Sequence, residues 1–486
     1  MRLPQSNLTL PSWLFYSFAM VIILLLFGRL TPAYAIFNSD MYFHLGIGEW
    51  MLDHRQIPTY AINSFDPSLP YVTHEIWFQW ALAWLYQKGG WNLVHLASSL
   101  CLFFTVYAMV RLLQEGRETK DLTGMDVFIL LLLLLPMMMM FFSIRPQIVS
   151  APLIVWAFVW MVRFTKKPRM WRALILVGSS FVLANVHGGV WPVLFVLWGI
   201  VVAAYVYQEK RLPLSFVILS ISQFGVALFN PGGLENILYI LLVGGDPRVA
   251  EWNEEWKPLV YTSHPTLLLV FLLFLFCVFL MKRNPLSLFL ALGIGTLAVS
   301  GFKQAHFLFL FLPFFWGLVP NTNLLRFSLS FSRFLLLFTL GVVAYAGAGI
   351  LPEKAEANPN YPVEEMAYVN QHYHQPKVLA DFNVSSYILQ QGGSVLADGR
   401  WDPFQQDESR KGSRNFTALE RSYYITKGHL PILLEEISLS HPDVLLLPHN
   451  PDGTRPFEEE AITKRFGEPV FEGTWGKVWD VKEETP

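Results

Sequence analysis

The chain has 486 residues, of which 53% are hydrophobic and only 15% are charged, and its mean hydropathy is +0.39. Because a typical soluble domain carries roughly 25% charged residues, this composition excludes an ordinary soluble protein. The two cysteines, Cys101 and Cys277, both lie in apolar runs, which excludes a disulfide framework.

Charged residues are distributed unevenly along the chain. Residues 1–351 contain 22 basic and 15 acidic residues, whereas residues 352–486 contain 13 basic and 22 acidic residues. The formal net charge of −2 is therefore the sum of a basic part and an acidic part. We predict an all-α, multispanning membrane domain over residues 1–351 and a small soluble α/β domain over residues 352–486.

The first part contains eleven apolar segments that are predicted to cross the membrane as helices. A crossing helix needs about 20 apolar residues for a hydrocarbon core roughly 30 Å thick, and fewer where the bilayer thins. The predicted spans are Trp13–Leu30, Trp91–Leu112, Val127–Phe142, Ile148–Val162, Ala173–Val186, Val190–Tyr207, Leu214–Phe229, Thr266–Met281, Leu286–Ser300, Phe307–Val319 and Phe334–Leu351. One alternative is open for the first span, because Pro32-Ala33-Tyr34-Ala35 resembles a signal-peptide cleavage site.

Lysine and arginine residues give these spans an orientation. With the N-terminus inside, the alternate connections carry 15 basic residues on one side and 7 on the other. Short loops with an excess of Lys and Arg stay in the cytoplasm. The N-terminus is therefore predicted to be cytoplasmic, and an odd number of spans then places residues 352–486 on the outside.

Two large outer loops, residues 31–90 and 230–265, are predicted to carry the functional groups. The first contains two predicted interfacial helices, Met41–Asp53 and His74–Lys88, of which the second is too short between polar ends to cross. No acidic residue lies inside a predicted span, and the histidines of the membrane part lie at or near outer ends. Ion-coupled transporters usually bury carboxylates at mid-membrane, so a reaction at the outer interface is favoured.

A block of residues after the first span carries a family resemblance. Residues 37–46 read FNSDMYFHLG, and they are followed by Ile57-Pro58, Ser64-Phe65-Asp66 and His74-Glu75-Ile76-Trp77. This block resembles the opening of bacterial membrane glycosyltransferases of the C type, the GT-C superfamily. Relatives in that superfamily include protein O-mannosyltransferases, oligosaccharyltransferases and aminoarabinose transferases. Further resembling landmarks are Arg145-Pro146-Gln147, Asn185-Val186-His187-Gly188-Gly189, Asn230-Pro231-Gly232 and Asp398-Gly399-Arg400.

The resemblance implies a GT-C-like fold, a polyprenyl-phosphate-linked sugar as donor, and an active-site carboxylate in the first outer loop. Asp40 is the matching residue of this sequence. Met41 follows it, so the adjacent acidic pair of some relatives is absent, which leaves a metal requirement of the oligosaccharyltransferase kind open. No cofactor is otherwise expected. The expected partners are the donor lipid, membrane lipids, and an acceptor that is a glycan, a lipid or a protein, with no nucleic acid.

Sugar transfer to a hydroxyl or amide needs a base for the acceptor's proton and positive charge for the departing phosphate. Asp40 is the predicted base, and Arg and Lys are suited to holding phosphate. The predicted catalytic residues are Asp40, His44, His74, Glu75 and His187, and the predicted donor phosphate-binding residues are Arg145, Lys303 and His306.

Structural alternatives are open for the residues of the first outer loop. Asp is a favoured N-cap, so Asp40 also suits the start of a helix at Met41, and His44, one turn further on, would then only pair with it. His74 and Glu75 would in the same way merely begin a solvated interfacial helix. Under these alternatives the loop has no catalytic carboxylate.

The later residues have structural alternatives as well. His187 precedes two glycines, which a tight turn explains without catalysis. Arg145 and Lys303 are also placed to extend toward lipid headgroups. A metal site made of Asp40, His44, His74 and His187 is a further alternative, although no ligand spacing in the sequence is diagnostic of one.

The acidic tail is predicted to fold as a small α/β domain. The predicted strands are Lys377–Phe382, Ser394–Asp398 and Asp443–Leu447, the predicted helices are Val384–Gln390 and Leu430–Ile437, and residues 471–479 are predicted to form a closing hairpin. Asp398-Gly399-Arg400 follows a predicted strand. Its position agrees equally well with a sugar-binding loop and with a simple turn.

Together these patterns predict a glycosyltransferase in a bacterial cytoplasmic membrane that acts at the outer face. Two other classes of protein remain open. A transporter or flippase of a lipid-linked substrate would share an outer cavity, and a non-catalytic assembly factor would use the soluble tail to bind partners.

Overall fold

A computed structural model of the chain describes residues 39–116, 126, 129–130, 144–236, 238, 247–252, 265–300, 302–320, 360–405, 416–449 and 459–481. Three of the predicted spans, Trp13–Leu30, Val127–Phe142 and Phe334–Leu351, lie wholly or mostly outside these residues. The other eight coincide with described helices. The total of eleven spans therefore stays a prediction.

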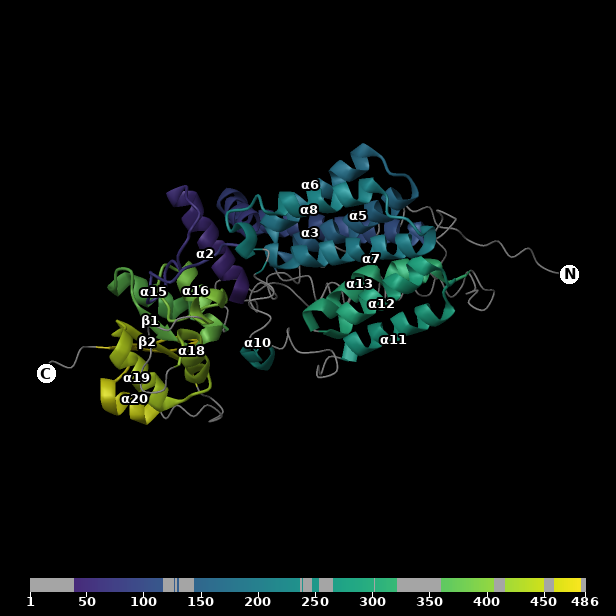
Figure 1. The fold of residues 1–486 in the computed structure, drawn as a ribbon. Coiled ribbons are helices and arrows are strands. Elements are labelled where there is room, and N and C mark those ends of the chain that lie inside the picture. The colour runs from purple at the N-terminus through teal and green to yellow at the C-terminus, as the bar shows by residue number, and fades with distance from the viewer. Residues whose placement is uncertain are drawn as a thin grey trace. The chain divides into compact units, whose positions relative to one another are not determined.

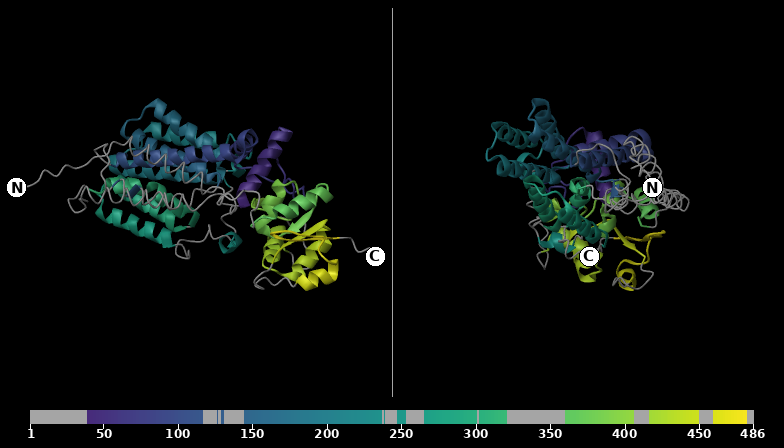
Figure 2. Two further views of the ribbon diagram at one scale, coloured as in Figure 1. Left: turned by 180° about the vertical axis from the view of Figure 1, so that it is seen from behind. Right: turned by 90° about the vertical axis from the view of Figure 1, so that its right-hand side faces the viewer.

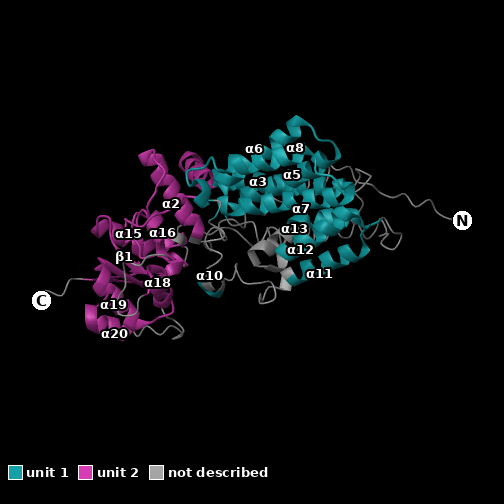
Figure 3. Cartoon of the chain, viewed as in Figure 1, with its two compact units in different colours: residues 1–31, 92–351 teal, residues 32–91, 352–486 magenta. Residues whose placement is uncertain are grey.

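The chain divides into two compact units (Figure 3). The first, called the helical unit here, comprises residues 1–31 and 92–351. The second, called the mixed unit, comprises residues 32–91 and 352–486. The first outer loop thus packs with the C-terminal segment, although residues 92–351 separate the two in sequence. The predicted domain boundary between residues 351 and 352 stays a prediction.

Apolar helices that run side by side make up the helical unit (Figures 1 and 2). They are the second half of α3 (Ile76–Glu115), α5 (Gln147–Lys166), α6 (Met170–Val186), η1 (Gly188–Val190), α7 (Trp191–Glu209), α8 (Leu214–Ala227), α11 (Pro265–Leu280), α12 (Pro285–Ser300) and α13 (Phe302–Leu318), with the short α10 (Pro247–Trp252) before α11. By length and composition, three of the described helices are long and apolar enough to cross a membrane, namely Ile76–Glu115, Gln147–Lys166 and Gly188–Glu209. Shorter apolar helices pack beside them. The prediction that this part of the chain is helical, with helices able to cross a membrane, is therefore confirmed.

One end of the helical unit gathers charged residues. The Nε of Arg163 donates to Oε1 of Glu115 at 2.6 Å, which joins the ends of α5 and α3. Gly116, which follows α3, approaches the end of α13 closely, because a Cβ added to it would lie 3.0 Å from the carbonyl carbon of Gly317. The N–H of Lys282, which follows α11, donates to the carbonyl oxygen of Leu318 at 3.1 Å. Connections that were predicted to share the cytoplasmic side therefore lie at one end of the unit.

The element labelled α3 begins inside the mixed unit and consists of two helices. It starts at Ile76 and continues to Glu115, with non-helical dihedral angles at Gly89 and Gly90 that separate the two helices. The break lies between the predicted helices His74–Lys88 and Trp91–Leu112, as expected, but the first helix starts at Ile76, so His74 and Glu75 precede it.

Before this break, α3 has one buried and one exposed face. Phe78 and Leu82 are buried, whereas Trp77, Trp80 and Trp84 are 39%, 48% and 43% exposed. Tryptophan is enriched where a membrane meets water, and a helix with one apolar aromatic face suits that layer. The pattern agrees with the predicted interfacial placement, which stays a prediction.

The mixed unit combines the first-loop helix α2 (Ser39–His54) with a small α/β fold. Its further helices are α15 (Val363–His372), α16 (Phe382–Gln390), α17 (Asp402–Gln405), α18 (Ala418–Thr426), α19 (Leu430–Ser440) and α20 (Glu459–Phe466), and its strands are β1 (Val378–Ala380), β2 (Val444–Pro448), β3 (Phe471–Glu472) and β4 (Gly476–Asp480). The views show α15 and α16 on one side of the sheet and α19 and α20 on the other (Figures 1 and 2).

The sheet has the strand order β1-β2-β4-β3. Strands β1 and β2 are parallel, with Val378 opposite Val444, and helices lie between them in sequence, as a parallel pair requires. Strands β3 and β4 form the predicted hairpin. The segment predicted as a strand at Ser394–Asp398 is not a regular strand, because it makes only isolated bridges, one of them between Ser64 and Val395. That bridge ties the first loop to the tail.

Helix α2 lies between α3 and α16. A Cβ added to Gly48 would collide with the carbonyl oxygen of Gln79 and lie 2.8 Å from the Cβ of Ala83, so only glycine allows this approach to α3. On the other side, the ring of Tyr42 packs edge-on against the ring of Tyr387 in α16, with centroids 5.0 Å apart. The contact of Tyr42 lies within one turn of Asp40, and the contact of Gly48 holds the second half of the helix.

Candidate functional site

Asp40 lies in the first turn of α2, half-buried, beside a loop of the C-terminal segment. The helix begins at Ser39 rather than at the predicted Met41, so Asp40 is inside the helix instead of preceding it. A Cβ built on Gly399 would be 2.8 Å from Oδ1 of Asp40 and 2.9 Å from Cδ1 of Phe43. The backbone at Gly399 is therefore in direct contact with the predicted base.

Asp398 and Arg400 flank this glycine and form a buried ion pair. The Nε of Arg400 donates to both carboxylate oxygens of Asp398, at 2.9 and 3.1 Å, and neither side chain is exposed. The Nη2 of Arg400 also donates to the carbonyl oxygen of Ile62 at 2.9 Å. The rings of Tyr71 and Phe404 lie 5.5 Å from the guanidinium carbon. Asp398-Gly399-Arg400 is thus a turn with a buried, structured centre.

His44, His74 and Glu75 form a buried cluster in the same unit. Nε2 of His74 lies 3.2 Å from Oε1 of Glu75, and Nδ1 of His44 lies 4.0 Å from Oε2 of Glu75. Nδ1 of His74 also lies 3.1 Å from the carbonyl oxygen of Val72. Both ring nitrogens of His74 therefore lie beside oxygen atoms that can accept a hydrogen bond. The cluster joins two histidines and a carboxylate in a buried polar site.

Gln79 completes this cluster and was missed by the sequence reasoning. Its Nε2 lies 3.3 Å from Nδ1 of His44, and its side chain is fully buried. The only signal available was its spacing, because residues four apart on a helix share a face and Gln79 follows Glu75 by four. A single glutamine in a tryptophan-rich helix carries no chemical pattern of its own.

His187 lies in the helical unit, in the turn between α6 and α7. It is buried, and its Nδ1 lies 3.1 Å from Oγ of Ser150 in α5. Just before it, Nδ2 of Asn185 donates to the carbonyl oxygen of Phe229 at 3.3 Å. Asn236 then packs on the turn, since its Nδ2 donates to the carbonyl oxygen of Ala184 at 3.1 Å. His187 is therefore part of a polar cluster at the end of α6.

The predicted phosphate-binding residues lie at helix starts. Arg145 is half-buried just before α5, and its carbonyl oxygen accepts from the N–H of Ile148 at 3.0 Å. Lys303 and His306 fall in the first turns of α13, and their side chains lie outside the part of the chain that is described. Within the described residues, no group of three or more His, Cys, Asp or Glu side chains has the geometry to hold a metal ion.

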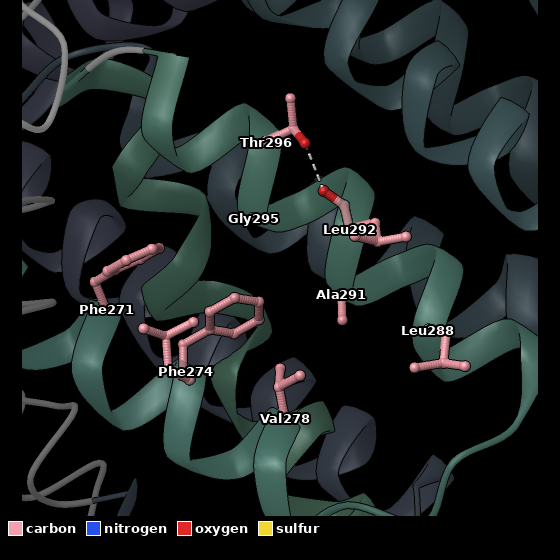
Figure 4. Close-up of a pocket in the computed structure, with 9 residues that line it drawn as sticks. Phe271, Phe274, Val278, Leu288, Ala291, Leu292, Gly295 and Thr296 are labelled. Carbon is pink, nitrogen blue, oxygen red and sulfur yellow. Dashed lines mark hydrogen bonds between the residues drawn. The ribbon is translucent and has the colours of Figure 1, made fainter.

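An apolar cavity of about 720 Å³ opens between α11 and α12 in the helical unit (Figure 4). Its lining is hydrocarbon, and the one side-chain hydroxyl, that of Thr296, donates to the carbonyl oxygen of Leu292 at 2.7 Å. Lining residues include Phe271, Phe274 and Leu288. The volume lies in the range of roughly 300–1,000 Å³ that is usual for ligand pockets. Such a cavity suits a chain of hydrocarbon.

Comparison with known proteins gives matches at the level of the fold. No protein-family model and no curated protein sequence matches the chain. The structure of ArnT from Cupriavidus metallidurans bound to undecaprenyl phosphate matches with a TM-score of 0.54 at 11% identity, over 97% of this chain and 98% of that chain.

Two further solved structures match. The archaeal oligosaccharyltransferase AglB from Archaeoglobus fulgidus, in complex with an inhibitory peptide and a dolichol-phosphate, has a TM-score of 0.59 at 10% identity, over 90% of this chain and 69% of that chain. The arabinofuranosyltransferase AftD from Mycobacteria has a TM-score of 0.56 at 13% identity, over 99% of this chain and 40% of that chain.

These neighbours are glycosyltransferases of the C type, so the resemblance drawn from the first-loop block is confirmed at the level of fold. This chain is a membrane protein with a GT-C-like fold. The match to ArnT extends over nearly the full length of both chains, and it therefore includes both units.

Glu49 connects α2 to α16 and gives the mixed unit a dependence on pH. Its carboxylate accepts from Nε2 of Gln390 at 3.3 Å. Burial raises the pKa of Glu49 above its usual value of 4.5, the hydrogen bond from Gln390 acts in the opposite direction, and the charge of Asp53 adds to the rise. A raised pKa means that the folded state favours the protonated acid. Stability from this group therefore falls as pH rises from 4.5 through the folded-state pKa.

We expect Glu49→Gln to remove this loss, because the amide stays neutral at every pH. The thermal midpoint in detergent, followed from pH 4 to pH 7, should fall less steeply with rising pH than in wild type. Glu364→Gln is a matched control of opposite sign, since hydrogen bonds from Thr474 lower the pKa of Glu364 and favour its ionised form. An unchanged pH slope in Glu49→Gln would contradict the assignment.

Proposed function

We propose that this protein is a membrane glycosyltransferase that moves a sugar from a polyprenyl-phosphate-linked donor to an acceptor at the outer face of a bacterial cytoplasmic membrane. The observation that carries the proposal is the placement of Asp40. In a chain with a GT-C-like fold, this first-loop carboxylate lies against the Asp398-Gly399-Arg400 turn, in the same unit as the His44, His74 and Glu75 cluster.

Asp40 acts as the general base in the proposed reaction. Its carboxylate takes the proton of the acceptor hydroxyl or amide, and the acceptor atom forms a bond to the anomeric carbon of the sugar. The bond from that carbon to the lipid phosphate breaks, and its electron pair leaves with the phosphate. A positioned base contributes roughly 10²–10⁴-fold to such a step.

The cluster of His44, His74 and Glu75 orients the acceptor in this proposal. The three side chains are buried and lie beside one another, so they present fixed polar groups rather than mobile ones. Fixed polar groups act without reorganisation during the reaction, which is why they stabilise developing charge better than water does. His187, held by Ser150, is proposed as a further polar contact for substrate.

A lipid-linked donor is supported by two observations. Among the structural neighbours, ArnT was solved with undecaprenyl phosphate and AglB with a dolichol-phosphate. In this chain, the cavity between α11 and α12 has a hydrocarbon lining, as an isoprenoid chain requires (Figure 4). Arg145, Lys303 and His306 are proposed to hold the phosphate of the donor.

The orientation proposed for the chain rests on charge. The basic connections, with 15 Lys and Arg residues against 7, face the cytoplasm, and the C-terminal segment is outside. A reporter enzyme that is active only outside the cytoplasm, fused after Pro486, should be active. The same reporter fused after Lys167, in a connection proposed to be cytoplasmic, should be inactive. Activity in the reverse pattern would overturn the orientation and the outer-face reaction with it.

Removing the proposed phosphate contacts should weaken donor binding. A hydrogen bond to a charged group contributes roughly 1.5–3 kcal/mol, so Arg145→Ala and Lys303→Ala should each raise the donor Kd about tenfold or more. Binding of a polyprenyl-phosphate analogue to purified protein measures this directly. Arg169→Ala, in the exposed connection between α5 and α6, is the control and should leave the Kd unchanged. Unchanged affinity in both site variants would leave these residues as headgroup anchors.

Asp40→Asn should abolish transfer while the protein stays folded in the membrane. Asparagine keeps the size and helix-capping ability of aspartate but cannot accept a proton, so a base role predicts a rate loss on the order of 10² or more. A role limited to helix capping predicts almost no loss, and a transporter would also be indifferent. Turnover of a lipid-linked sugar by purified protein is the measurement, with gel filtration as the folding control. Retained turnover in a folded variant would sink the catalytic assignment.

A further inference from the structure

The C-terminal segment is hydrogen-bonded to the first outer loop along a short stretch of backbone. The N–H of Phe65 donates to the carbonyl oxygen of Val395 at 2.8 Å, and the N–H of Val395 donates to the carbonyl oxygen of Asn63 at 3.0 Å. Nδ2 of Asn63 also donates to the carbonyl oxygen of Leu389 at 3.4 Å. The loop and the tail therefore share one framework, and a shift in one moves the other.

The buried charge of Arg400 strengthens this framework two residues before α17. Its guanidinium pairs with Asp398 inside the turn and reaches across to the carbonyl oxygen of Ile62 in the loop. Breaking a buried ion pair by removing one partner strongly destabilises a protein, so these contacts favour the observed position of the turn relative to Ile62. The N–H of Arg400 also donates to Oδ1 of Asp398 at 3.0 Å, which closes the turn around Gly399.

Gly399 is the point at which this turn meets Asp40. A Cβ there would lie 2.8 Å from Oδ1 of Asp40 and 2.9 Å from two ring atoms of Phe43. Real Cβ atoms essentially never approach other atoms so closely, so any side chain at 399 must displace the carboxylate, the ring or the turn. The side-chain hydroxyl of Ser386 accepts from the N–H of Gly399 at 3.4 Å and supports the turn from α16.

We infer that the Asp398-Gly399-Arg400 turn is a positioning element that fixes the carboxylate of Asp40 for catalysis. This inference rests on the proposed function, in which Asp40 is the base. Gly399 sets the position of the carboxylate by direct backbone contact, and Arg400 and Asp398 hold Gly399 there. The C-terminal segment therefore forms one wall of the catalytic site, in addition to any contact that it makes with an acceptor.

A methyl group at position 399 has two consequences for the reaction. It displaces the carboxylate, the ring of Phe43 or the turn, each of which changes the position of Asp40 relative to the turn. A misplacement of about 1 Å in a catalytic group costs as much as roughly 10²-fold in rate. The methyl group also takes water from the carboxylate, and desolvation raises the pKa of an acid. Since the ionised form of Asp40 is the active base, a raised pKa shifts the acid limb of the turnover profile to higher pH.

The test compares Gly399→Ala with Gly473→Ala, a matched control. A Cβ on Gly473 would lie 2.6 Å from Oε1 of Glu365, so it crowds a carboxylate of the same unit that has no part in the proposed site. In Gly399→Ala, kcat should fall between about tenfold and a hundredfold with the donor KM within about twofold of wild type. The acid limb of kcat should move to higher pH. Gly473→Ala should lose about as much thermal stability as Gly399→Ala but should keep the kcat and the pH profile of wild type.

Wild-type kcat and an unmoved acid limb in Gly399→Ala would overturn the inference. If Asp40→Asn is inactive in the same assay, the proposed function stands and only the positioning role is lost, whereas active Asp40→Asn removes the proposed function. Should Gly399→Ala fail to give a monodisperse protein, Arg400→Lys decides the question. Lysine keeps the charge but cannot make the forked contacts to Asp398 and Ile62, so kcat should fall without a change in donor KM. Wild-type kcat in Arg400→Lys would equally overturn the inference.

Discussion

The buried guanidinium of Arg400 is the interaction on which the mixed unit depends. A charge removed from water is stable only when it is paired and hydrogen-bonded, and here the partners are the carboxylate of Asp398 and the carbonyl oxygen of Ile62. One partner comes from the tail and the other from the first outer loop. The two segments are therefore tied at the turn that touches Asp40, and the proposed base inherits its position from that tie.

The helical unit meets a different constraint, because hydrocarbon cannot satisfy polar groups. Its helices form their own backbone hydrogen bonds, and some interior side chains bond to neighbouring helices. The hydroxyl of Ser180 donates to the carbonyl oxygen of Gln223, and the indole of Trp191 donates to that hydroxyl in turn. Such bonds fix how α6, α7 and α8 pack. A further contact of this kind joins Oγ of Ser150 in α5 to Nδ1 of His187 at the end of α6.

The likeness to ArnT, AglB and AftD at 10–13% identity shows how little of a sequence a membrane fold requires. Apolar side chains facing lipid are interchangeable, so the pattern of spans persists while individual residues change. Chemistry follows from the site and not from the fold. The proposal for this chain therefore rests on Asp40, on the turn beside it and on the cluster around Glu75, and each of these is a specific contact with a specific test.

The sequence by itself determined the membrane class, most described helices and the closing hairpin, because apolar runs and period-two alternation are local signals. The GT-C-like fold was implied by the resemblance that its first-loop block carries. The sequence also selected Asp40, His44, His74 and Glu75, although it left their roles open. Only the tertiary structure decided that the first outer loop packs with the tail and that residues 394–398 form bridges instead of a strand. These features depend on contacts between residues some 330 positions apart, and such contacts leave no periodic trace in a single sequence. The approach of Gly399 to Asp40 is of this kind, since a glycine in sequence does not say what its missing side chain would have touched.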